Sequence, residues 1–338
     1  MGDARKHHYL PVFYQNLFIN ADGLSWVYDR GHGVYRHLPP KVVCFQKDLY
    51  AIVPPDAPKD QRLETQALAT ADGMCSSAMR ELTTGKMPPD FATMANVAYF
   101  VGLQASRLPS TSKYISDVYR NAGEEFMRLS SVSVERMERL LTQYSETSGE
   151  ALSVSAESMV EAIRGKHLEV VVNERPFLEH VFHQADFLSK VFLGMCWNIL
   201  LSPSDTGFIL CDDPFVVVPP FGGTDIGIGI PGAAKYFPLT RRSCLRIGDA
   251  GQEFRYRKID KEMVVAINKN VAANSERFIM GPDKAQLEEI VVGSGSSKMD
   301  RQPRRKTFMM NQTNGGSFQV VTTIPGRYFY IGDEHALP

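Results

Sequence analysis

The sequence predicts an α+β fold in which a helical middle packs on antiparallel strands contributed by the N-terminal and C-terminal parts of the chain. Three observations predict it. Strand patterns occupy residues 1–55, apolar residues recur at helical spacing over 60–200, and strand patterns return over 207–280 before a terminal helix. We expect residues 1–280 to form a single domain, and 281–338 to follow as a linker, a basic run and a C-terminal hairpin.

The strand-rich opening is organised around the segment Lys6–Phe18, KHHYLPVFYQNLF. Its large apolar and aromatic side chains are too many to leave in water, so we expect an ordered, buried segment rather than a frayed terminus. Leu24–Asp29 and Gly33–Leu38 flank a turn and predict a hairpin. Lys41–Phe45 predicts a third strand. The opening should therefore form a small meander around Lys6–Phe18.

Apolar spacings of three and four predict the helices of the middle. A first helix runs from about Asp60 to Gly85, a second from about Asp90 to Pro109, a third over roughly Lys113–Ser145, and another opens at Arg175-Pro176 and leads through Trp197 to Leu201. Prolines or glycines end most of these segments.

Strand patterns return after residue 206. Gly207–Pro220 predicts a strand, a turn at Asp213-Pro214 and a second strand, and YFPL and SCLRI predict two more. Lys261–Met280 predicts the terminal helix. Beyond Gly281, SGSSK predicts a linker, Arg301–Lys306 is a basic run, and SFQVVTTI with RYFYIG predicts the final hairpin.

Composition limits the function classes. Apolar residues make up 43% and charged residues 22%, and the formal net charge is −1, so the chain has no general attraction to nucleic acid or to anionic membranes. Contact with nucleic acid would need a local patch, and the basic tail is the candidate surface for a protein partner or a second subunit. Five scattered cysteines without a Cys-x-x-Cys pair favour a reducing cytosol. The most apolar helical run, Phe187–Leu201, is too short to span a membrane, so we expect a soluble cytoplasmic protein.

Several segments, in order, resemble one family. HHYLPVFY-x-x-LF, followed by WVYDR and PPKVVCFQKDLY, is similar to the start of the domain-of-unknown-function family 4238. LETQALATADGM resembles its first acidic helix, and YFVGLQASRLP its Gln-x-x-Arg-x-Pro helix end. CWNILLSPSDTGFILCDDPFVV resembles its Trp-containing helix, strand and Asp-Pro turn, and FPLTRRSCLRI with AINKNVAANSERFIM its last strand and helix. The resemblance covers about residues 6–280 and implies no particular reaction.

The sequence departs from the family pattern at two places. Asp72-Gly73 stands where Glu-Gly is usual, which shortens the acidic side chain by one methylene. Cys211-Asp212-Asp213 stands where Ser-Asp-Asn or similar is usual, so either aspartate could be the equivalent one.

The matching segments carry polar residues that simple packing does not require. The candidate catalytic residues are His7, His8, Asp72, Gln104, Arg107 and Asp213, and His8, Asp72 and Asp213 are the candidate ligands of a divalent metal. We expect at least three of their four segments to bring a side chain within about 8 Å of a common point.

Each candidate also has a structural interpretation. Neighbouring side chains on a strand face opposite ways, so His7 and His8 cannot share one role. Asp72 could form a buried salt bridge, Arg107 could cap the last turn of its helix, and Asp213 could serve only the turn before Pro214. Gln104 and Arg107 lie three residues apart and so share a helix face.

Two functions remain open. The first is a phosphodiester hydrolase, nuclease-like, with a histidine as general base or metal ligand and Arg107 stabilising phosphate charge; a bacterial toxin or defence effector is the setting that this function suggests. The second is a non-catalytic binding protein whose polar cluster is structural. The sequence contains no nucleophile elbow, P-loop, dinucleotide fingerprint or kinase motif set.

Overall fold

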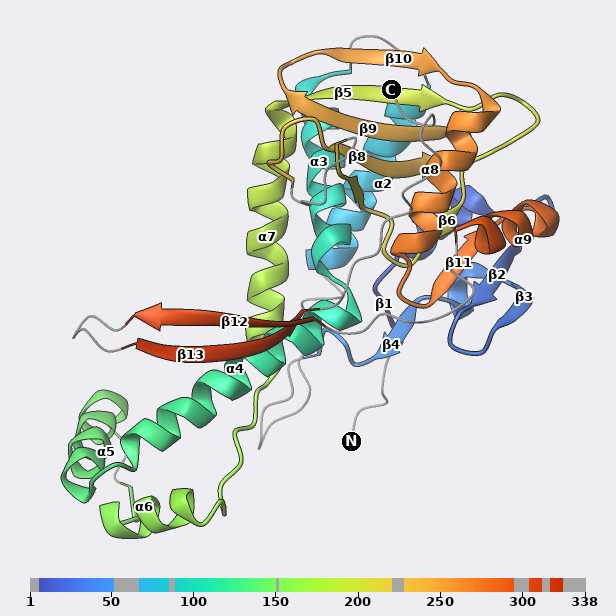
Figure 1. Cartoon of the computed structure of the whole chain (residues 1–338). Helices are drawn as coiled ribbons and strands as arrows, with labels where there is room; N and C mark the ends of the chain where they lie inside the picture. The colour runs from blue at the N-terminus through green and yellow to red at the C-terminus, as the bar shows by residue number, and fades with distance from the viewer. Residues whose placement is uncertain are drawn as a thin grey trace. The chain divides into compact units, whose positions relative to one another are not determined.

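The computed structural model describes residues 6–51, 67–84, 89–149, 152–220, 228–294, 304–311 and 317–324 (Figure 1). The chain divides into two compact units. The larger unit takes the described residues of 1–111 and 177–302, and the smaller unit those of 112–176 and 303–325. Helices and mainly antiparallel strands are both present, which confirms the predicted α+β class.

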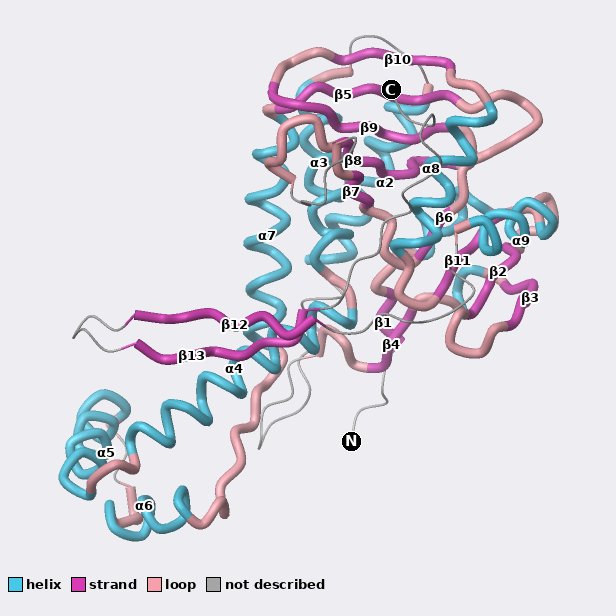
Figure 2. The backbone as a smooth tube through the Cα atoms, viewed as in Figure 1, coloured by secondary structure: helices cyan, strands magenta, loops and turns pink. Residues whose placement is uncertain are grey.

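The larger unit contains a five-stranded sheet of strand order β10-β5-β9-β8-β7. Its strands are β5 (Met195–Leu201), β7 (Val216–Val218), β8 (Ala234–Thr240), β9 (Ser243–Ala250) and β10 (Phe254–Lys258). All neighbours are antiparallel except β10 and β5, which pair in parallel. Figure 2 shows these strands lying together with helices beside them. The strands predicted from YFPL and SCLRI are thus confirmed as β8 and β9.

The segment around Trp197 is a strand, and the prediction that the preceding helix continues to Leu201 is wrong. Helix α7 (Arg175–Leu193) ends before Gly194, and β5 follows. Trp197 and Ile199 are both fully buried, at the period of two that a strand imposes. The Trp197 indole Nε1 donates to the Phe192 carbonyl at 2.8 Å and so fixes the corner between helix and strand.

A four-stranded antiparallel sheet in the same unit has the order β3-β2-β11-β6. It consists of β2 (Ser25–Asp29), β3 (Val34–Leu38), β6 (Leu210–Cys211) and β11 (Phe278–Gly281). The β2–β3 hairpin was predicted. The prediction that the terminal helix continues to Met280 is wrong, and strand β11 occupies its last residues. Helix α8 (Lys261–Asn274) ends at Ser275, whose hydroxyl donates to the Ala272 carbonyl at 2.7 Å.

The opening segment is strand only at its start. Strand β1 (Lys6–His8) pairs with β4 (Phe45–Lys47), and the short helices α1 (Val12–Gln15) and η1 (Asn16–Phe18) follow it. The third strand was predicted over 41–45, but the 3-10 turn η2 (Pro40–Val42) occupies its start and strand β4 begins only at Phe45. The expected burial of the opening segment is confirmed at Tyr9, Leu10, Tyr14 and Phe18.

The helices of the larger unit include α2 (Ala69–Thr83), α3 (Phe91–Ser106) and α7. Helices α3 and α7 touch at Gly102, where a Cβ would lie 2.8 Å from the Ala185 carbonyl oxygen, so only glycine fits. Tyr14 and Phe100 both pack on Phe237 of β8, which joins α1 and α3 to the five-stranded sheet. Helix α9 (Lys284–Gly293) precedes the predicted SGSSK linker, in residues for which the sequence predicted no helix.

The smaller unit contains most of α4 (Pro109–Ser130), with α5 (Val134–Ser148) and α6 (Ala156–Arg164). The single helix predicted over 113–145 is interrupted because Ser133 acts as an N-cap, its side chain accepting from the Arg136 amide at 3.3 Å. Met137, Ala156 and Val160 form a small apolar cluster between α5 and α6.

The unit also contains the hairpin of β12 (Arg304–Asn311) and β13 (Ser317–Ile324). Its first strand includes part of the basic run, and RYFYIG lies outside the described residues. No helix within the described ranges is long and apolar enough to cross a membrane.

Candidate functional site

The two adjacent histidines have different environments, as strand alternation predicts. His7 is fully buried; its Nδ1 accepts from the Tyr50 amide at 2.9 Å, and its ring stacks on the Tyr50 ring. His8 lies on the other face of β1 and is half-buried. Its Nε2 lies 3.2 Å from the Lys41 carbonyl oxygen, and its ring packs edge-on against Phe45. His7 therefore belongs to the core, and His8 is the histidine that a ligand could reach.

Asp72, Gln104 and Arg107 come together between α2 and α3. Both terminal nitrogens of Arg107, Nη1 and Nη2, donate to Asp72 Oδ1 at 3.2 Å. With its amide oxygen turned toward the guanidinium, Gln104 accepts from Arg107 Nε at 2.8 Å and also from Nη2. The Arg107 side chain is 1% exposed and the Asp72 side chain 24% exposed, so this is a buried cation with a partly accessible counterion. The end of the helix is capped by the backbone of Arg107, whose N–H donates to the Leu103 carbonyl at 3.0 Å.

Tyr50 connects the histidine segment to Arg107. Its amide donates to His7, and its hydroxyl donates to the Arg107 carbonyl oxygen at 3.2 Å. Beside it lies a cavity of about 340 Å³, which we call the His8 cavity. The lining residues are His8, Pro11, Val12, Phe13, Tyr50, Leu68, Ala69, Asp72 and Arg107. Three of the four predicted segments thus contribute to one cluster, and Tyr50 is a member that sequence reasoning missed.

The fourth predicted segment is placed differently. Asp213 lies in the turn between β6 and β7, is 2% exposed, and is not among the described residues that line the His8 cavity. Its carbonyl oxygen accepts from Asn274 Nδ2 of α8 at 2.7 Å. Within the described ranges, no group of three or more His, Cys, Asp or Glu side chains could hold a metal ion. The predicted metal set of His8, Asp72 and Asp213 is therefore not assembled in the described structure, where Asp72 is paired with Arg107 instead.

The protonation state of His8 follows from its surroundings. Partial burial lowers the pKa of His8 below its ordinary value of 6.5, against the opposing effect of the hydrogen bond to Lys41. Because a carbonyl oxygen can only accept, His8 Nε2 must carry the proton in the neutral ring, and Nδ1 then carries the lone pair. His8 is therefore set up as a neutral proton acceptor at neutral pH.

Asp212, rather than Asp213, is the aspartate that organises the backbone at the end of β6. It is 1% exposed. Its Oδ1 accepts from the amide of Glu276 at 2.8 Å, and its Oδ2 accepts from those of Arg277 and Phe278 at 2.7 and 3.0 Å. These donors lie 64 to 66 residues away in the sequence, so no local pattern distinguishes the two aspartates.

We expect Asp212→Asn to lower the free energy of unfolding by about 1.5–3 kcal/mol, because an amide offers one acceptor oxygen to backbone groups that now share two charged ones. Urea denaturation followed by circular dichroism measures this. Asp205→Asn, on an exposed loop, is the matched control and should change the stability little. A variant as stable as the parent would show that these three hydrogen bonds contribute nothing net.

Residues 6–285 match the model of the family described as "Protein of unknown function (DUF4238)". No curated protein and no solved structure matched the chain. The family match covers every residue of the His8 cavity, and its description adds no chemistry to what the geometry shows.

Proposed function

Since the chain belongs to the DUF4238 family, whose description states no activity, we propose its function from the His8 cavity: hydrolysis of a phosphodiester, in a nuclease-like reaction. One observation carries the proposal. A neutral histidine, a carboxylate and a buried guanidinium, brought from three distant segments, line the same cavity. Base and positive charge at one concave site are what hydrolysis of a phosphate ester requires.

The reaction assigns one role to each group. His8 Nδ1 accepts a proton from a water molecule as the water oxygen bonds to phosphorus. The P–O bond to the leaving alcohol then breaks, and the leaving oxygen takes up a proton from solvent. The positive charge of Arg107 favours the extra negative charge that develops on the phosphate oxygens.

Arg107 has one N–H group with which it could donate a hydrogen bond to a substrate. Of its five N–H groups, Nε and one on Nη2 serve Gln104, while a second on Nη2 and one on Nη1 serve Asp72. One N–H on Nη1 remains without a hydrogen bond to the described residues. Asp72 shares the charge of Arg107, and its partial exposure makes it the group that a bound phosphate would displace or repel.

The second candidate function is a non-catalytic binding protein, and the burial of the cluster favours it. Arg107 and Gln104 are almost completely buried, and Gln104 accepts hydrogen bonds from two nitrogens of the Arg107 guanidinium. A buried polar set of this kind can have a purely structural role, which is to hold the opening segment against α2 and α3. In that case nucleic acid or a protein partner would bind elsewhere on the surface.

The His8→Ala variant separates the two functions. We expect it to lower kcat/KM for a fluorescent single-stranded oligonucleotide, or for bis(4-nitrophenyl) phosphate, by at least about 100-fold, the contribution of a general base. His183→Ala, at an exposed position of α7, is the matched control and should retain full activity. Each protein is assayed with and without Mg²⁺ and Mn²⁺. Equal turnover by the His8 variant, or none by the parent protein, would leave the binding protein as the better description.

The pH profile gives a second readout. The pKa of His8 lies below 6.5 in the folded protein, so the ring stays neutral at neutral pH and is protonated only as the pH falls below that value. The parent kcat/KM should therefore rise with pH and level off with a midpoint below 6.5. Any residual activity of His8→Ala should lack this acidic limb.

A further inference from the structure

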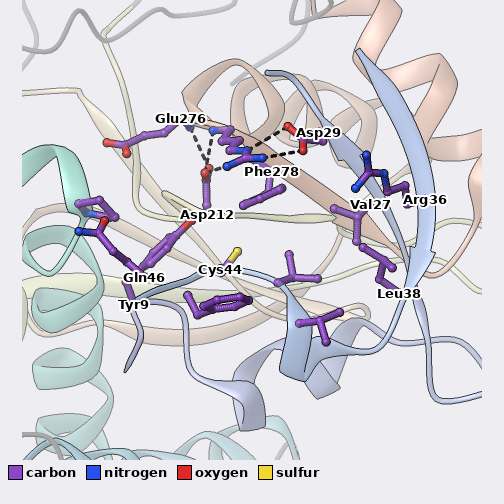
Figure 3. A pocket seen from close by; sticks show the side chains of 15 residues that line it. Tyr9, Val27, Asp29, Arg36, Leu38, Cys44, Gln46, Asp212, Glu276 and Phe278 are labelled. Atoms are coloured by element: carbon purple, nitrogen blue, oxygen red, sulfur yellow. Dashed lines mark hydrogen bonds and ion pairs between the residues drawn. The ribbon is translucent and has the colours of Figure 1, made fainter. Parts of the chain in front are cut away.

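A second cavity, of about 530 Å³, lies on the four-stranded sheet, and the proposed hydrolysis does not use it. Figure 3 shows its lining. Charged side chains lie along one part of it, and Val27, Leu38, Val42 and Phe45 are among the apolar residues that line the rest. We call it the Arg36 cavity. Its volume is within the range of small-molecule sites, and a mainly apolar wall with a few charged groups is typical of them.

The carboxylates of the Arg36 cavity are already engaged. Asp212 accepts from three backbone amides, as described above. Asp29 accepts from Arg277 Nε and Nη2 at 3.0 and 2.9 Å and lies 2.9 Å from His32 Nδ1. Burial alone would raise the pKa of Asp29, but the contacts with Arg277 and His32 outweigh it and hold the pKa at about 2. Glu276 accepts from the Ser110 hydroxyl.

The two arginines of the cavity use fewer of their hydrogen-bonding groups than the carboxylates do. The Arg277 guanidinium gives Nε and Nη2 to Asp29, which leaves Nη1 outside that pair. Arg36, on β3 opposite Val27, is exposed and has no hydrogen bond or ion pair with any described residue. A guanidinium with unused N–H groups at the rim of a cavity suits an anion, and phosphate above all, because its geometry matches the donor fork.

Aromatic rings complete the cavity. Phe278 lies under the Arg277 guanidinium, whose central carbon is 4.6 Å from the ring centroid. Phe45 lies under the Lys6 ammonium at the same distance, which brings a third positive charge near the cavity. Both rings are only half-buried. The cation covers one face of each ring, so a planar base would stack on the opposite face, a contact that tolerates any base.

We propose that the Arg36 cavity binds a nucleoside monophosphate, with the phosphate at Arg36 and Arg277 and the base against the aromatic and aliphatic wall. The occupant follows from the combination of two available guanidinium groups with half-buried phenyl rings in one cavity of suitable volume. Inorganic phosphate would contact only the guanidinium groups, and a free nucleoside only the phenyl rings and the aliphatic wall. The proposal does not depend on hydrolysis at the His8 cavity.

Isothermal titration calorimetry of the full chain with AMP, GMP, CMP and UMP tests this. We expect at least one of the four to bind with 1:1 stoichiometry, and the matching nucleoside and inorganic phosphate to bind at least about 10-fold more weakly. Arg36→Gln should weaken the nucleotide about 10-fold or more. Arg257→Gln, which removes an exposed arginine from β10, is the matched control and should bind like the parent.

The proposal is overturned if none of the four nucleotides binds at 10 mM, roughly the weakest affinity of interest for a small ligand. It is equally overturned if Arg36→Gln binds as tightly as the parent, or if the nucleoside binds as tightly as its monophosphate. The melting temperature of each variant, measured first, establishes that it is folded.

Discussion

Phe18→Ala is expected to lower the free energy of unfolding by about 3–5 kcal/mol, the range for truncating a fully buried phenylalanine. Phe18 is 0% exposed and packs edge-on against Tyr14, with ring centroids 5.7 Å apart. Tyr14 in turn stacks on Phe237 of β8. The cavity left by the ring would therefore open where the N-terminal segment is attached to the five-stranded sheet. Urea denaturation followed by tryptophan fluorescence and by circular dichroism measures the change.

Phe13→Ala is the matched control for Phe18→Ala. Phe13 is only half-buried and lines the His8 cavity, although its ring contacts Phe100. Truncation there removes less buried area, and its cost should be clearly smaller. If Phe13→Ala destabilised the protein as much as Phe18→Ala, the packing of Tyr14 and Phe18 would not be the main contact that holds the opening segment to the five-stranded sheet.

Asp72→Ala is expected to cost about 3 kcal/mol of stability. The change leaves the Arg107 guanidinium in a site where it is 1% exposed, with Gln104 and the face of Phe100 as its remaining partners. Removing one partner of a buried ion pair typically costs about 3–5 kcal/mol, because the other charge stays desolvated. We expect the low end of this range, since Asp72 is itself partly exposed and water can reach the vacated position.

Asp186→Ala tests whether this cost comes from burial rather than from the loss of any ion pair. Asp186 pairs with Lys190 at 2.6 Å on the surface of α7, with side chains 60% and 71% exposed. An exposed pair of this kind is worth about 0–1 kcal/mol. Similar losses for the two variants would mean that Arg107 is well solvated after Asp72 is removed. Asp72→Ala combined with Arg107→Met should recover part of the stability, because no buried charge then remains.

The local residue pattern is enough to predict which segments are buried and, for most of them, whether they form helix or strand. The density of aromatic residues in Lys6–Phe18 required burial, because no exposed terminus could keep so much apolar surface in water. The helical spacing before Arg107 predicted helix α3, and the short apolar runs YFPL and SCLRI predicted the strands β8 and β9. It also singled out Asp72, Gln104 and Arg107, whose residue types do not suit plain packing.

Contacts between distant segments determine the structure wherever similar local patterns lead to different results. The apolar run from Arg175 to Leu201 reads as one helix, yet Trp197 lies in a strand because β9 and β10 pair with it, and hydrogen bonds to partners about 50 residues away outweigh local propensity. Likewise Asp212 and Asp213 are equivalent in sequence. The amides of the first residue of β11 and of the two residues before it hold the Asp212 carboxylate, while the backbone carbonyl of Asp213 accepts from Asn274 of α8. The meeting of Asp72 with Arg107 follows from how α2 packs on α3, a contact between segments 35 residues apart that no local spacing encodes.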